Sequence, residues 1–162
     1  MNTLTHYING SAFAGDSTRV QPVFNPATGA SSRNVPLASV ADVKAAVASA
    51  HAAFPAWSKL PPLARARVLD RYARILWERQ SELARAISEE HGKTYEDSMG
   101  EVTRGIEVVE FATGAPHLLK GEFSANVGRN IDSHSVRHAL GVVAGITPFN
   151  FPAMVPMWMF PI

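Results

Sequence analysis

Two polar side chains stand where they could do chemistry. Asn150 follows a short apolar run, Leu140–Ile146, and a proline-rich break, so its amide comes just after a predicted strand. Ligands of α/β sheets bind beside the carboxyl ends of strands, and an amide placed there can donate a hydrogen bond into the crevice. The alternative is a turn asparagine whose side chain bonds its own backbone, and the spacing alone favours that alternative.

Arg104 is the second candidate, because it interrupts a mostly apolar stretch of a predicted helix. A guanidinium in such a place can hold a carboxylate through two parallel hydrogen bonds. The alternative is an ion pair with Glu101 or Glu107, each of which lies three residues away along the helix. The helical spacing alone favours the ion pair.

Two further features of the sequence are weaker signals. Phe151, Val155 and Trp158 recur one helical turn apart, and an aromatic stripe of this kind is usually part of a core. Lys93, in the sequence HGKT, is predicted to be a helix-end residue, because the upstream glycine of a phosphate-binding loop is missing. The histidines show no paired spacing typical of metal ligands, so no metal site is predicted.

Short strands are predicted at the N-terminus. His6–Gly10 is predicted as a short strand that ends in an Asn-Gly turn, with Ala12 and Phe13 in the return strand, which is typical of a tight hairpin. Val20–Phe24 is a further strand, and the turn residues Asn25-Pro26 and Gly29 follow it. A small sheet on the outside of the domain is the simplest interpretation.

Long helices are predicted to follow. Ser39, with Asp42 three residues on, starts the first one in a variant of the capping box, and Pro55 and then Pro61-Pro62 end it. The second helix runs without a break from about residue 63 to about residue 91. The residues expected to bury one face of the first helix are Val43, Ala46, Val47, Ala50 and Phe54.

The C-terminal half contains a third helix and further strands. Gly92 is expected to stop the second helix, and Thr94 is expected to cap the third. The stretch 123–139 alternates roughly and predicts two strands with a turn at Gly128–Asn130. Leu140–Ile146 is then a partly β-branched apolar run that suits a strand buried on both faces.

The composition excludes several classes of protein. The chain has 162 residues, a net charge of +1 and no cysteine, so disulfides and thiolate metal sites are excluded. Basic and acidic residues are interspersed, and a nucleic-acid-binding protein is not indicated. The C-terminal apolar run is broken by prolines and does not suit a membrane span. The first residues lack a signal or transit pattern, so the cytoplasm is expected.

Several motifs, met in order along the chain, resemble the aldehyde dehydrogenase superfamily. PFNFP after an apolar strand is similar to the cofactor-entry turn of that superfamily. The continuation AMVPMWMFPI resembles its methylmalonate-semialdehyde dehydrogenase branch. The upstream motifs that agree are YING, FNPATG, EHGKT, GEVTRGIEVVEFATGAP and VRHALGVVAGI, so the resemblance covers almost the whole chain.

The resemblance implies an α/β fold, the N-terminal part of the aldehyde dehydrogenase fold, with a Rossmann-like cofactor domain and a strand pair of the oligomerisation sheet. Residues 1–122 would be the N-terminal part of the NAD-binding domain, 123–139 the oligomerisation strands, and 140–162 the start of the Rossmann-like core. In the family those strands pair with strands from the far C-terminus. A homo-oligomer, dimer or tetramer, is therefore implied for the full-length protein.

The resemblance also implies roles for single residues. Asn150 would donate an N–H to the oxyanion formed when a cysteine thiolate attacks an aldehyde, beside the backbone N–H of that cysteine. Arg104 would hold the substrate carboxylate, with Arg137 as the second choice. Phe151 and Trp158 would lie along the aldehyde tunnel, and core and tunnel stay equally open for them. The residues implied to line the NAD cleft are Ile146, Thr147, Pro148 and Phe149, although G-x-G-x-x-G is missing.

The activity implied for the parent enzyme is NAD-dependent oxidation of malonate or methylmalonate semialdehyde. Carbon dioxide would leave, and transfer of the acyl group to coenzyme A would give acetyl-CoA or propionyl-CoA, in the setting of valine or inositol catabolism. Without a cysteine, this chain is expected to be the inactive N-terminal piece of a longer protein. Two alternatives stay open: another aldehyde dehydrogenase, such as one for succinate semialdehyde, and an interaction module that uses unpaired sheet edges.

Overall fold

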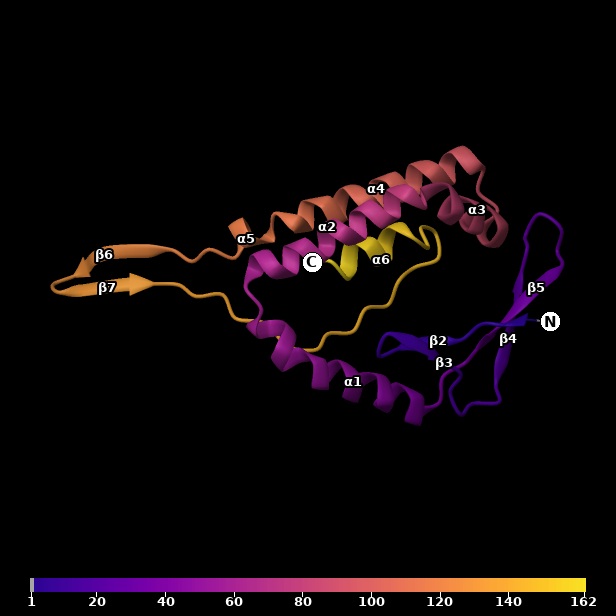
Figure 1. Ribbon diagram of the computed structural model, residues 1–162, viewed down its shortest axis with the longest axis horizontal. Coiled ribbons are helices and arrows are strands. Elements are labelled where there is room, and N and C mark those ends of the chain that lie inside the picture. Colours follow the sequence, from indigo (N-terminus) through magenta and orange to yellow (C-terminus); the bar gives the residue numbers. More distant parts are fainter. Residues whose placement is uncertain (1) are drawn as a thin grey trace.

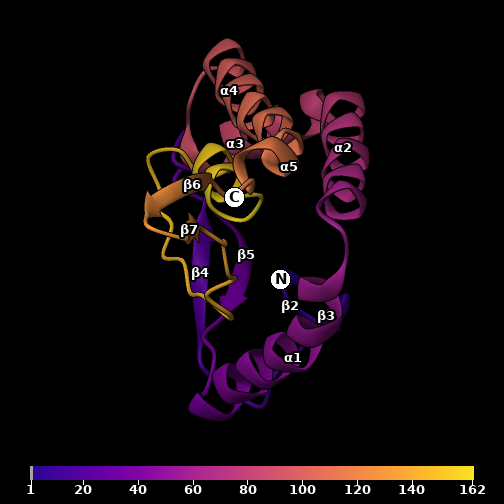
Figure 2. The same ribbon diagram turned by 90° about the vertical axis from the view of Figure 1, so that its left-hand side faces the viewer.

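The chain forms a layer of helices, a group of short strands and a hairpin that projects from one end (Figure 1). The computed structural model describes residues 2–162. The elements are β1 (Asn2–Thr3), β2 (His6–Ile8), β3 (Ser11–Phe13), β4 (Val20–Phe24), β5 (Ser31–Pro36), α1 (Val40–Lys59), α2 (Pro62–Glu78), α3 (Gln80–His91), α4 (Tyr95–Thr113), α5 (Ala115–Leu118), β6 (Phe123–Gly128), β7 (Ile131–His134) and α6 (Met154–Met159). Helices α2 to α6 lie together and α1 runs apart from them, as the view turned by 90° also shows (Figure 2).

The N-terminal strands form two small sheets. In the first, β5 lies between β1, which runs parallel to it, and β4, which runs antiparallel. The second is the predicted β2–β3 hairpin, in which Asn9 and Gly10 both have positive φ, 53° and 72°. An Asn-Gly pair adopts that conformation at low cost, so the predictions of this hairpin and of the strand Val20–Phe24 are confirmed.

Helix α1 begins as predicted, and it ends just before the predicted Pro61-Pro62 but not at Pro55. The Ser39 hydroxyl accepts from the Asp42 N–H at 3.1 Å, and the Asp42 carboxylate accepts from the Ser39 N–H at 2.7 Å, which completes a capping box. The prediction that Pro55 ends the helix is wrong, because α1 continues to Lys59. The carbonyl of His51 that loses its partner lies on the exposed side, where water can satisfy it.

The predicted buried face of α1 is also largely exposed. Val43 and Val47 are 54% and 53% exposed, and Asp42 is the one buried residue of the helix. The β2–β3 hairpin faces this side across an open groove of about 430 Å³, which Ala46 and Ala50 line. An apolar stripe stays exposed when no other element covers it, and within residues 2–162 none does.

The predicted second helix is two helices, α2 and α3, with a break at Arg79. Arg79 has φ −106° and ψ 15°, outside helical geometry, and its guanidinium holds Glu82 in the first turn of α3 through two hydrogen bonds of 2.8 and 2.6 Å. The change of direction lets both helices pack against α4. The prediction of one unbroken helix is therefore wrong, whereas the predicted stop at Gly92, with φ 84°, is confirmed.

Helix α4 is the centre of the core. The Thr94 hydroxyl caps it by accepting from the Asp97 N–H at 3.2 Å, as predicted. Helices α2, α3 and α6 pack around it. The core residues are Ala73, Leu76, Ile87, Val102, Ile106, Val109 and Met157. The helix that carries Arg104 is thus the best buried element that the structure describes.

The C-terminal part contains one confirmed and one wrong prediction of strands. The β6–β7 hairpin forms where expected and projects away from the helices (Figure 1). Leu140–Ile146, predicted to be a buried strand, is irregular, and Leu140, Val143 and Ile146 are 96%, 76% and 95% exposed. A strand needs a neighbour to take its backbone hydrogen bonds, and within residues 2–162 none lies beside this run.

Two negative findings concern the described residues only. No three His, Cys, Asp or Glu side chains among them are grouped so that they could hold a metal ion. None of the helices formed by residues 2–162 is both long enough and apolar enough to cross a membrane.

Candidate active site

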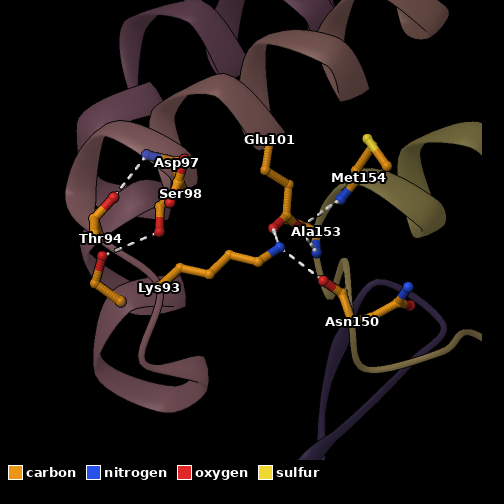
Figure 3. A network of polar contacts seen from close by, with 9 residues as sticks. Lys93, Thr94, Asp97, Ser98, Glu101, Asn150, Ala153 and Met154 are labelled. Carbon is orange, nitrogen blue, oxygen red and sulfur yellow. Dashed lines mark hydrogen bonds and ion pairs between the residues drawn. The ribbon is translucent and has the colours of Figure 1, made fainter. Parts of the chain in front are cut away.

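The segment that carries Asn150 lies against the end of α3 and the first turns of α4. The ring of Phe149 contacts that of His91, with centroids 5.3 Å apart. The backbone carbonyl of Asn150 accepts a hydrogen bond of 2.7 Å from the ammonium of Lys93 (Figure 3). The same ammonium lies 3.9 Å from the centroid of the Phe151 ring, within the range of a cation–π interaction.

Glu101 holds the other end of this segment. Its side chain is fully buried, and its carboxylate accepts from the Lys93 ammonium at 2.6 Å. The second carboxylate oxygen accepts from the backbone N–H groups of Ala153 and Met154, at 2.9 and 3.1 Å (Figure 3). Burial would raise the pKa of Glu101, but the hydrogen bond from Lys93 and those from the two backbone groups outweigh it and hold the pKa below its usual value.

The amide of Asn150 itself is uncommitted. The side chain is exposed and points away from the Lys93–Glu101 pair (Figure 3). It makes no hydrogen bond with any other residue of the range 2–162, so the geometry differs from that of an asparagine folded back on its own turn. The backbone carbonyl of Asn150 is thus held by Lys93, whereas its side-chain amide is free to bind a ligand.

Arg104 lies in an open cavity next to this segment. The cavity has a volume of about 500 Å³ and is lined by Lys93, Glu96, Asp97, Gly100, Arg104 and Phe151. The guanidinium carbon of Arg104 is 5.9 Å from the Phe151 ring centroid. Within residues 2–162 neither Glu101 nor Glu107 pairs with Arg104, because Glu101 is taken by Lys93 and no carboxylate lies within 4.0 Å of the guanidinium. The Arg104 end of the cavity therefore offers an unpaired cation.

The residues implied to line a cofactor cleft form an open edge. Ile146 and Phe149 are 95% and 62% exposed, and Thr147 and Pro148 are exposed as well. The backbone groups of Ile146 and Thr147 make no hydrogen bond with any other part of the described chain. These polar groups are free for a ligand.

The aromatic stripe is not the core face of α6. That face consists of Met154 and Met157, which are buried. Phe151 is half-buried in the wall of the cavity, and Trp158 is 44% exposed and donates its indole N–H to the Arg104 carbonyl at 3.4 Å. Arg137 is exposed and does not line the cavity.

Sequence reasoning missed the pairing of Lys93 with Glu101. It predicts Lys93 as a helix-end residue, and it offers Glu101 only as one of two possible partners of Arg104. A usable signal was present, because Glu101 shares its helix face with Val102, Gly105 and other core positions. A carboxylate on such a face needs a cation or several N–H groups to balance its burial.

Comparisons with known proteins agree on one family. The family model described as the aldehyde dehydrogenase family matches residues 13–162. The chain is 54% identical over 162 residues to the malonate-semialdehyde dehydrogenase of Pseudomonas aeruginosa. The match covers all of this chain and 32% of that relative. It is 51% identical over 160 residues to malonate-semialdehyde dehydrogenase 3 of Geobacillus kaustophilus, of which it covers 33%.

Solved structures give the same result. The methylmalonate-semialdehyde dehydrogenase of Oceanimonas doudoroffii superposes with a TM-score of 0.96 at 55% identity, over 99% of this chain and 33% of that one. A candidate methylmalonate-semialdehyde dehydrogenase of Sinorhizobium meliloti 1021, solved in complex with NAD, superposes with a TM-score of 0.96 at 51% identity and the same coverage. The chain thus spans about a third of the length of the relatives it matches.

Proposed function

The chain belongs to the aldehyde dehydrogenase family, and from this premise we propose that it is the N-terminal third of an NAD-dependent semialdehyde dehydrogenase. The proposed parent enzyme oxidises malonate or methylmalonate semialdehyde, releases carbon dioxide and transfers the acyl group to coenzyme A. About 50% identity to relatives of that name supports the substrate class. The chain has no cysteine, so the nucleophile comes from the remainder of the parent.

The observation that carries the proposal is the free amide of Asn150 beside a cavity with an unpaired guanidinium. When a thiolate adds to an aldehyde, negative charge develops on the carbonyl oxygen. An amide N–H already in position stabilises that charge, and loss of one such donor typically costs about 3–4 kcal/mol in the transition state. Asn150 can serve in this way because no other group in residues 2–162 competes for its side chain.

Arg104 gives the proposed site its selectivity. A semialdehyde of malonate carries a carboxylate at the end opposite the aldehyde, and a guanidinium can bind it through two parallel hydrogen bonds. Arg104 lines the same cavity as Phe151, the residue after Asn150, and this cavity is the proposed place of the substrate carboxylate. Glu96 and Asp97 also line the cavity and would repel a carboxylate that entered at their end.

The open edge at Ile146–Phe149 fits one wall of a dinucleotide site. Its exposed side chains and unpaired backbone groups are available to a ligand with both apolar and polar parts. NAD, which a similar structure holds, would accept the hydride from the oxidised carbon. The residues of this chain would bind and orient it.

The exposed β6–β7 hairpin supports an oligomeric parent. It projects from the helices, and its apolar side chains Phe123, Val127 and Ile131 are 68%, 57% and 57% exposed. Strands with free edges pair readily with other strands. A homodimer or homotetramer of the full-length protein would cover them.

Replacement of Arg104 by methionine in the full-length enzyme tests the substrate class. We expect kcat/KM for malonate semialdehyde to fall about 30- to 100-fold, the loss of hydrogen bonds to a charged group, while propanal, which has no carboxylate, is oxidised as before. Arg137→Met is the matched control, because Arg137 is exposed and lies outside the cavity lining. Equal losses for both aldehydes would refute the role of Arg104.

Omission of coenzyme A separates this reaction from that of a hydrolytic aldehyde dehydrogenase. The proposed enzyme needs coenzyme A for turnover with malonate semialdehyde and releases carbon dioxide. A steady rate without coenzyme A, or a preference for succinate semialdehyde, would leave the family in place and remove the acyl-transfer step.

A further inference from the structure

Residues 91–101, from the end of α3 into α4, contact the segment 149–154 at several successive positions. His91 contacts the ring of Phe149, and Lys93 binds the carbonyl of Asn150 and faces the ring of Phe151. Eight residues on, Glu101 accepts from the N–H groups of Ala153 and Met154. Two segments more than fifty residues apart in the sequence are therefore held in a fixed register (Figure 3).

We propose that Lys93, held in place by Glu101, is a positioning residue that aims the amide of Asn150 at the reacting oxygen. The proposal rests on the oxyanion role of Asn150 described above. It assigns a task to an ion pair that touches neither the aldehyde nor the nucleophile. Lys93 acts through the backbone of Asn150, because its ammonium binds the carbonyl and leaves the side chain free.

The chain around Asn150 has little regular structure of its own. Residues 135–153 form no helix and no strand, so neither a helical nor a ladder pattern of hydrogen bonds fixes Asn150. The ammonium restrains it on one side at 2.7 Å, and the carboxylate restrains the start of α6 at 2.9 and 3.1 Å. A donor must be held within about 0.5 Å of its productive place to stabilise a transition state well.

Burial makes these restraints strong. The Glu101 side chain is 0% exposed and that of Lys93 is 15% exposed, so water competes little for either charge. Charge-assisted hydrogen bonds in such surroundings are shorter and stiffer than neutral ones. The surface pair of Arg79 and Glu82, 62% and 64% exposed, has no such shielding and contacts no part of the segment 149–154.

A double-mutant cycle in the full-length enzyme tests the proposal. The variants are Lys93→Met, Asn150→Ala and both together, and the readout is the first-turnover rate of NADH formation from propanal, which avoids Arg104. We expect Lys93→Met alone to lower that rate about tenfold, as loss of a supporting contact does, with the KM for NAD unchanged. In the Asn150→Ala background the same change should lower it less than about twofold, because the aimed group is already absent.

The outcomes are distinguishable. Equal rate losses from Lys93→Met in both backgrounds would mean that the pair only stabilises the fold, and the positioning role would be overturned. If Asn150→Ala leaves the rate unchanged, the oxyanion role fails first and the positioning role fails with it. If both single variants lower the rate and the losses do not add, both roles stand. Arg79→Met is the control and should leave the rate unchanged.

A second variant, Lys93→Arg, keeps the proposal testable if Lys93→Met does not fold. Lys93→Arg keeps the positive charge against Glu101 but replaces the compact ammonium by a planar, longer group. We expect it to fold, to lower the rate of the parent enzyme and to have almost no effect in the Asn150→Ala background. Full activity of Lys93→Arg in the parent would overturn the proposal.

Discussion

At the scale of single residues, the carboxylate of Glu101 connects the core to the site. It lies on the buried face of α4 and has three partners, one ammonium and two backbone N–H groups. Its own helix supplies none of them. Every one of these contacts crosses to Lys93 or to the start of α6, so a change at this position acts at a distance from α4.

Glu101→Gln should destabilise the fold by about 3 kcal/mol, because a half-buried ammonium is left without its counter-charge. Urea unfolding of the chain followed by circular dichroism measures the free energy of unfolding. Glu82→Gln is the matched control, since it removes an exposed ion pair, and it should leave that free energy unchanged. An equal loss from the two variants would contradict the role of burial.

The same variant should change the acid sensitivity of the fold. The folded-state pKa of Glu101 is lowered, so its stabilising contribution is complete above the ordinary glutamate pKa of about 4.3 and is lost as the pH falls through the folded-state value. The free energy of unfolding of Glu101→Gln should therefore fall less steeply with pH in this acid range. If the free energy of unfolding depends on pH with the same slope in Glu101→Gln and in the unmodified chain, Glu101 is not the titrating group.

The roles implied for Asn150 and Arg104 by local motifs stay predictions. Arg104 and Phe151 line one cavity, and Asn150 precedes Phe151 in the sequence. The Lys93–Glu101 pair escaped because its meaning depends on Ala153 and Met154, which are more than fifty residues further on. The alternative interpretation of Arg104 offered Glu101 or Glu107 as its partner, since spacing within one helix is visible in a sequence and contacts between distant segments are not.

At the scale of elements, the approach of α6 to α4 depends on one glycine. A Cβ at Gly105 would lie 2.6 Å from the sulfur and 3.3 Å from the Cβ of Met157, and 3.3 Å from the backbone of Met154. A Cβ at Gly100, one and a half turns earlier, would meet only the end of the Arg104 side chain at 3.5 Å. Of these two glycines, only Gly105 therefore lies at the contact with α6.

Gly105→Ala and Gly100→Ala should have opposite effects on stability. Alanine favours a helix over glycine by up to about 1 kcal/mol, which Gly100→Ala should gain. At Gly105 the overlap with α6 costs about 1–3 kcal/mol and outweighs that gain. Thermal unfolding of the two variants measures the difference. A higher melting temperature for Gly105→Ala than for the unmodified chain would show that α6 can shift away from the added Cβ without a loss of stability.

Elements with a local signal were predictable, and those that depend on a partner were not. The capping box at Ser39, the left-handed Gly92 and the cap at Thr94 each involve a few adjacent residues. The break at Arg79 exists because α2 and α3 both pack on α4, which no local pattern encodes. Leu140–Ile146 has the composition of a buried strand, yet composition does not supply a neighbouring strand.

At the scale of the whole molecule, the chain leaves much apolar surface uncovered. Leu140, Val143 and Ile146 are almost free of contacts, and the apolar residues of α1 and of the β6–β7 hairpin are more than half exposed at several positions. Large exposed apolar areas often mark surfaces that another segment or chain covers.

The chain on its own should therefore associate at moderate concentration, as light scattering can measure. Val143→Lys together with Ile146→Lys should reduce the average mass, because two charges repel partners from the exposed run. Ala52→Lys with Ala56→Lys adds the same charge at exposed positions of α1 and serves as the control. A clean monomer for the unmodified chain would contradict the expectation.

The carboxylate of Glu101 also fixes an order of events during biosynthesis. Helix α6 has six residues, too few to persist alone in water, and Ala153 at its start offers no capping side chain. Its first N–H groups find their acceptor on a helix that emerged from the ribosome some fifty residues earlier. We therefore expect the loop around Asn150 to take its shape only once Lys93 and Glu101 of the earlier segment are in place.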